Sequence, residues 1–150
     1  MPDEPTWSTG PPDSATIELL ETQFDGDRLV SATSYRPDRF EPRLLVVEFD
    51  PSLYPPSIEA CRLDVRWFSS GDFSIRYLER HEPGTWECRW DRHPNGHNSR
   101  LHFHEPPDGT PGVDLNLEPL HPLDVYATVT TAIERRIESC WDGTSEHDGH

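Results

Sequence analysis

The fold is decided by the stretch Leu63-Asp64-Val65-Arg66-Trp67-Phe68-Ser69-Ser70-Gly71-Asp72-Phe73-Ser74-Ile75-Arg76-Tyr77. Apolar and polar residues alternate on both sides of Ser69-Ser70-Gly71-Asp72, whose composition is typical of a hairpin turn. Alternation with a period of two sends successive side chains to opposite faces of a strand. The stretch therefore predicts two antiparallel strands with one apolar and one polar face.

The same alternation recurs further along the chain, at 86–91 and at 101–104, and strand composition is also found at 29–35 and 44–49. Short connections between such strands are typical of an antiparallel meander. We predict an α+β fold: an antiparallel β-meander sheet of five or more strands, with a C-terminal helix packed on one face.

The helix is expected to begin at Pro122, to run to about Trp141 and to be capped by Gly143. Its apolar face would consist of Tyr126, Val129, Ile133, Ile137 and Cys140. Residues 14–23 form either a short helix capped by Ser14 or an edge strand. We predict a flexible segment over 1–12, a single α+β domain over 13–142 and a disordered tail over 143–150.

The chain is strongly acidic, with a formal net charge of −15 and thirteen arginines but no lysine. Dense carboxylates and the absence of lysine predict a halophilic, archaeal protein, whose surface stays hydrated in concentrated salt. At about 1 M salt the Debye length is about 3 Å, so overall acidity does not exclude nucleic acid as a partner.

The chain has no apolar run near the roughly 18 residues of a membrane span and no secretory signal pattern at its start. Its three cysteines (Cys61, Cys88 and Cys140) are widely spaced and predict reduced thiols. We expect a cytoplasmic protein without membrane association, and homo-oligomerisation is left open.

Residues 89–104 hold four of the eight histidines, three arginines and Asp91. Because this chain otherwise uses Asp and Glu as its polar residues, a cluster of Arg and His predicts a functional site. On the polar face of the meander, Arg66 and Arg76 are as compatible with an ordinary solvated surface as with a functional site.

One chemistry is metal-independent cleavage of RNA, in which two histidines act as general base and general acid and an arginine stabilises the phosphate. His102 and either His93 or His104 would form the proton-transfer pair, Arg89 or Arg100 would bind phosphate, and Asp91 would orient a histidine. The candidate catalytic residues are therefore His93, His102, His104, Asp91, Arg89 and Arg100.

The alternative is a metal site, for zinc or another divalent transition metal, formed by His93, His97, His102 and His104. Their spacing matches no standard zinc motif, so acid–base use without a cofactor is favoured. A third hypothesis is a non-catalytic protein-interaction or metal-binding domain of a haloarchaeal cytosolic protein.

The segments 73–77, 88–94 and 101–104 resemble the TumE-like family of predicted toxins from two-gene toxin–antitoxin modules, over about residues 73–108. The resemblance implies a growth-inhibiting toxin, possible action on RNA, and a partner antitoxin. The residues of this chain that match the positions of the family's motifs are Arg89, Asp91, His93, His102 and His104. The chain departs from the family pattern because its histidines are separated where members place adjacent ones.

Overall fold

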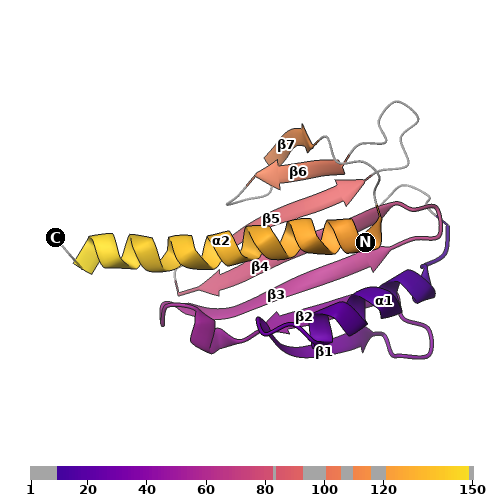
Figure 1. Ribbon diagram of the computed structural model, residues 1–150, viewed down its shortest axis with the longest axis horizontal. Coiled ribbons are helices and arrows are strands. Elements are labelled where there is room, and N and C mark those ends of the chain that lie inside the picture. Colours follow the sequence, from indigo (N-terminus) through magenta and orange to yellow (C-terminus); the bar gives the residue numbers. More distant parts are fainter. Residues whose placement is uncertain (1–9, 83, 93–100, 106–109, 116–120, 149–150) are drawn as a thin grey trace.

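The computed structural model describes residues 10–82, 84–92, 101–105, 110–115 and 121–148, without the side chains of 101–115 and 143–148. Within these ranges the chain forms one antiparallel sheet of seven strands, which lie side by side in chain order (Figure 1). The strands are β1 (Val30–Arg36), β2 (Leu44–Phe49), β3 (Ile58–Trp67), β4 (Phe73–His81), β5 (Gly84–Arg92), β6 (Leu101–Glu105) and β7 (Thr110–Leu115). The predicted meander is confirmed.

Two helices, α1 (Ser14–Asp25) and α2 (Pro122–Asp148), lie on the same face of the sheet (Figure 1), and a 3₁₀ turn at Pro51–Leu53 follows β2. α1 buries Ile17, Leu20 and Phe24, and α2 buries Val125, Val129 and Ile133. These residues pack on the apolar face of β2–β5 in one hydrophobic core. Both helices therefore cover one face, and the other face lies opposite them.

The β3–β4 hairpin turns at the predicted place. Gly71 has a φ of +91°, which an L side chain rarely adopts, and the amide of Phe68 donates to the carbonyl of Asp72 at 2.9 Å. The turn pairs Trp67 with Phe73, whose rings stack at 4.4 Å. This register fixes which residues of β3 and β4 face the helices.

Two helix boundaries differ from the predicted ones. Residues 14–25 are helical and not an edge strand, and Asp13 rather than Ser14 is the N-cap, because its carboxylate accepts from the Thr16 amide at 3.1 Å. α2 does not end at Trp141 but continues to Asp148, through the expected Gly143 cap and most of the expected tail. Glycine inside a helix costs only about 1 kcal/mol relative to alanine, which a long helix tolerates.

Neither helix in the described ranges combines the length and the apolar character needed to cross a lipid bilayer.

Candidate functional site

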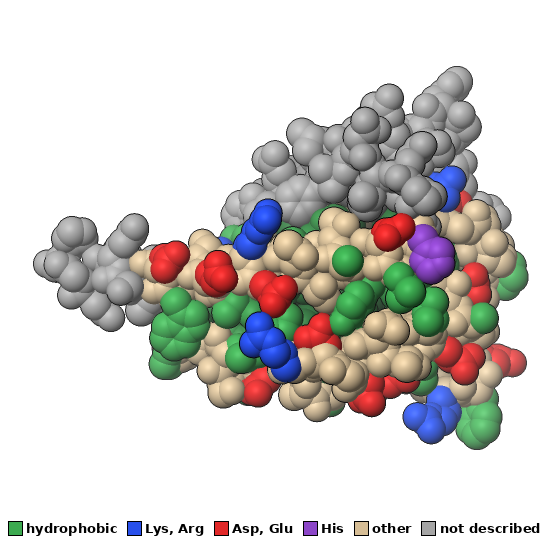
Figure 2. Space-filling model, viewed as in Figure 1, with side chains coloured by type: hydrophobic (Ala, Val, Ile, Leu, Met, Phe, Trp, Pro, Cys, Tyr) green, Lys and Arg blue, Asp and Glu red, His purple; other side chains and the backbone are tan. Residues whose placement is uncertain are grey.

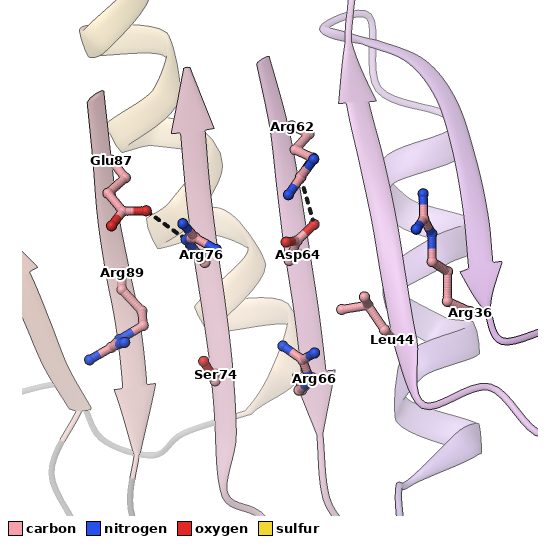
Figure 3. A pocket seen from close by; sticks show the side chains of 9 residues that line it. All are labelled: Arg36, Leu44, Arg62, Asp64, Arg66, Ser74, Arg76, Glu87 and Arg89. Carbon is pink, nitrogen blue, oxygen red and sulfur yellow. Dashed lines mark hydrogen bonds and ion pairs between the residues drawn. The ribbon is translucent and has the colours of Figure 1, made fainter. Parts of the chain in front are cut away.

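A concave site lies on the face of the sheet opposite the helices (Figure 3). Its volume is about 490 Å³. Strands β1 to β5 each contribute to its lining, which consists of Arg36, Leu44, Arg62, Asp64, Arg66, Ser74, Arg76, Glu87 and Arg89. We call this set the arginine face. Its five arginines and two carboxylates give a formal excess of three positive charges in a chain of net charge −15.

Strand alternation and register place these side chains together. Arg62, Asp64 and Arg66 follow one another at every second position of β3, so they share a face. The ladder then aligns Asp64 with Arg76 of β4, and Arg76 with Arg89 of β5. Directly opposed residues lie about 5 Å apart, so like charges in this row require compensation.

Ion pairs supply that compensation for part of the cluster (Figure 3). Arg76 Nε lies 2.6 Å from Glu87 Oε2, and Arg62 Nε lies 3.2 Å from Asp64 Oδ1. Arg36 and Arg66, in contrast, form no ion pair with any other residue that the structure describes. The arginine face therefore holds some guanidinium groups that are fixed by ion pairs and others, Arg36 and Arg66, that are uncommitted with respect to the described residues.

Asp91 lies two residues after Arg89 on β5, on the same face, and is 2% exposed. Its Oδ2 is 2.9 Å from Arg89 Nε. Burying a carboxylate is unfavourable unless a cation or hydrogen-bond donors compensate it. The pair therefore holds the Arg89 guanidinium, whose side chain is still 41% exposed, at the edge of the arginine face.

The predicted site residues divide into three groups. Arg89 and Asp91 are in contact with each other through an ion pair. His102 and His104 occupy β6 positions that pair with Asp91 and Arg89, and nothing is described of their side chains. The remaining predicted residues, His93, His97 and Arg100, lie outside the described ranges.

The predicted metal site therefore stays a prediction. Among the residues that the structure describes, no three His, Cys, Asp or Glu side chains are grouped so that they could hold an ion. The four histidines proposed as ligands are outside that search.

Sequence reasoning missed Arg36 and Arg62 as members of the site. Arg62 could have been found by extending the alternation of β3 by one step toward its start. Arg36 could not, because it lies in a turn-rich segment, and only the side-by-side order of β1, β2 and β3 brings it to this face.

The helix side of the molecule has the opposite charge (Figure 2). Exposed carboxylates lie along both helices, among them Glu18 and Asp25 on α1 and Glu134 and Glu138 on α2. The described carboxylates of both helices thus lie on the side away from the arginine face, which makes that face the one suited to an anionic ligand.

A second polar cluster lies beneath α2, inside the core. Glu79 is fully buried and accepts hydrogen bonds from Arg136 and from Tyr77, and it contacts His81 Nε2 at 2.8 Å. Burial by itself raises the pKa of Glu79, but the hydrogen bonds from Arg136, His81 and Tyr77 outweigh it and hold the pKa below its ordinary value. This cluster attaches α2 to the sheet.

Two cysteines of the core are poor nucleophiles. Burial raises the pKa of Cys61 and that of Cys88 to about 12. A thiol reacts as its thiolate, so neither residue is suited to covalent catalysis.

These features define a small α+β protein with an acidic helical side and a positively charged concavity on the open face of its sheet. The chain belongs to the TumE toxin family, because the sequence model described as Toxin TumE matches residues 17–137. The match runs from α1 into α2, far beyond the segment 73–108, and confirms the resemblance. No curated protein and no solved structure matches the chain.

Proposed function

We propose that this TumE-family protein is the toxin of a toxin–antitoxin pair and acts as a metal-independent ribonuclease through its arginine face. The observation that carries the proposal is the excess of arginine on one face of an acidic protein. Arginine binds phosphate with two parallel hydrogen bonds, and RNA presents phosphates in series.

The two arginines without an ion-pair partner among the described residues support the proposal that the substrate is a polyanion. Arg36 and Arg66 come from β1 and β3 and have no ion-pair partner among the described residues, so their N–H groups can serve phosphate oxygens. Arg62 and Arg76 are tied to carboxylates and set the local shape. Binding RNA releases counterions, which makes the interaction dependent on salt concentration.

The chemistry would occur where β5 meets β6. A histidine base removes the proton of the ribose 2′-hydroxyl, the 2′-oxygen attacks phosphorus, and the bond from phosphorus to the 5′-oxygen breaks. A histidine acid donates a proton to that 5′-oxygen, leaving a 2′,3′-cyclic phosphate and a 5′-hydroxyl. Arg89 would stabilise the charge that develops on the phosphate oxygens.

The pairing of β5 with β6 supports these roles, because His102 is in register with Asp91 and His104 with Arg89. A carboxylate beside an imidazole fixes its tautomer and orientation. We assign Asp91 to that task for His102, with His93 or His104 as the second proton carrier and Arg100 as a second phosphate ligand.

The test is cleavage of end-labelled RNA by the purified chain in the presence of EDTA. Arg89→Ala is expected to lower the cleavage rate about 100-fold, as loss of a donor to a developing anion does. Arg28→Ala is the matched control, because Arg28 is paired with Glu134 of α2. Absence of both cleavage and RNA binding in the wild-type chain would refute the proposal.

The partner is tested in cells. Expression of the chain alone is expected to arrest growth, and the Arg66→Ala/Arg89→Ala double variant is expected to relieve the arrest. If arrest persists in this variant, the arginine face is not the toxic site. Restoration of growth by the adjacent gene product would identify the antitoxin.

A further inference from the structure

The loop between β1 and β2 presents one fully projecting aromatic residue. Phe40 is 88% exposed, whereas the other exposed large apolar residues in the described part of the chain, Leu19, Leu123 and Trp141, lie between 36% and 43%. An isolated phenylalanine at the tip of a loop contributes nothing to the core. Its ring is therefore available to a ligand.

Hydrogen bonds hold the loop in one shape. Asp38 Oδ1 accepts from the amides of Phe40 and Glu41 at 2.9 and 3.0 Å, and the amide of Arg43 donates to the carbonyl of Arg36 at 2.9 Å. An Asp that accepts from amides two and three residues later is a common way to fix a tight turn. The Phe40 backbone is thus set before any ligand binds.

The loop adjoins the arginine face. It leaves the sheet after Arg36 and returns at Leu44, two paired residues that both line the concavity. Phe40 lies midway between them, four residues from each. The loop that carries Phe40 therefore begins and ends at the β1–β2 rim of the arginine face, where Arg36 and Arg66 have no ion-pair partner among the described residues.

This combination fits one ligand chemistry: a planar base with a phosphate beside it. A base can stack on an aromatic ring only when it is unpaired, since both its faces are covered inside a duplex. A protein partner is a poorer match, because a protein interface is built around clustered apolar anchors and Phe40 is alone.

We infer that Phe40 stacks on an unpaired base of single-stranded RNA at the β1 rim, while Arg36 and Arg66 hold the neighbouring phosphates. The inference rests on the proposed function and deepens it, since it makes single strands the substrate class. Duplex RNA would reach the arginines but not the ring.

The experiment measures binding by fluorescence anisotropy, with a labelled 2′-O-methyl oligouridylate that cannot supply the 2′-hydroxyl nucleophile. Phe40→Ala is expected to raise the Kd for the single strand about 5- to 100-fold. Phe40→Trp, which keeps a stacking ring, is expected to remain within about 3-fold of wild type. The control, Leu19→Ala, removes an exposed apolar side chain from the helix side and is expected to leave the Kd unchanged.

A second titration uses the same strand annealed to its complement, which Phe40→Ala is expected to leave unaffected. Equal weakening of single strand and duplex would overturn the inference. So would wild-type affinity of Phe40→Ala alongside weakened binding by Arg66→Ala, and in that case the proposed function survives. A wild-type chain that binds neither RNA overturns both. Matching melting temperatures for all variants would exclude misfolding. Such a match is expected for the Phe40 variants, because the Phe40 side chain is exposed.

Discussion

Arg136 of α2 and Glu79 of β4 form a bidentate pair across the helix–sheet interface, with Nε–Oε2 and Nη2–Oε1 distances of 2.8 and 2.7 Å. The Arg136 guanidinium also lies 3.6 Å above the centre of the Trp86 ring. Because Glu79 has no exposed surface, its charge depends on these partners. The pair fixes the position of the long C-terminal helix on the sheet.

Loss of this pair is expected to destabilise the fold strongly. Arg136→Ala leaves the Glu79 carboxylate buried without its cation, and should lower the free energy of unfolding by about 3 kcal/mol. Urea denaturation followed by circular dichroism measures the change. The neighbouring exposed arginine is the control: Arg135→Ala should shift stability by less than about 0.5 kcal/mol. Equal effects of the two variants would show that the pair contributes little.

The same pair predicts acid sensitivity. The folded chain holds the pKa of Glu79 below its ordinary value of 4.5, so the folded state binds fewer protons than the unfolded state. The stabilisation is therefore complete above the unfolded pKa and is lost as the pH falls through the folded pKa. Urea denaturation between about pH 7 and about pH 3 should show Glu79→Gln approaching wild-type stability in acid. A constant difference across this range would contradict the prediction.

Salt titration of RNA binding separates arginines that contact phosphate from those that do not. For single strands the slope of log Kd against log salt is about 0.7 per phosphate contact, so Arg66→Ala should reduce the slope by roughly that amount. Arg28→Ala, on the helix side, should leave it unchanged. A slope that is independent of Arg66 would remove this residue from the RNA-binding surface.

The two proposed chemistries differ in their metal dependence. If His102 carries a proton, His102→Ala should lower the RNA cleavage rate between about 10²- and 10⁴-fold, and EDTA should have no effect on wild type. If the histidines bind zinc instead, the purified chain should contain it by elemental analysis, and the His97→Ala/His104→Ala double variant should lose it. Full cleavage by His102→Ala would exclude the proposed proton transfer.

The composition predicts that salt stabilises the fold. The net charge of −15 is largely carried outside the arginine face, and repulsion among surface carboxylates weakens when the Debye length falls to about 3 Å near 1 M salt. The melting temperature is expected to rise steadily with KCl concentration. A protein with maximal stability in dilute buffer would contradict the halophilic interpretation.

The sheet and the C-terminal helix were predictable because their signals are local. Strict alternation around the turn at Gly71 defines β3 and β4, and three- and four-residue spacing of apolar residues from Tyr126 onward defines α2. The state of residues 14–23 was left open, because a short segment with few apolar residues fits either a helix or an edge strand. The segment is helical because the helix buries Ile17, Leu20 and Phe24 together against the sheet.

The candidate site was predictable only in part. Arg89 and Asp91 were identified because they belong to the cluster of Arg and His over 89–104, and alternation places both on one face of the strand. Arg36 was not, since its membership of the site depends on the order of three strands. The Glu79–Arg136 pair was also missed, because its partners are 57 residues apart and meet only when α2 packs on the sheet.

The sequence by itself determined the antiparallel meander, the C-terminal helix and the polar character of one sheet face, because each follows from periodicity within a few residues. Only the tertiary structure decided that five arginines from four strands converge on one concavity, and that a buried glutamate anchors α2. Such contacts join residues that are distant along the chain. They depend on how several strands are aligned across the whole sheet, whereas the alternation within one strand specifies only which of its own side chains share a face.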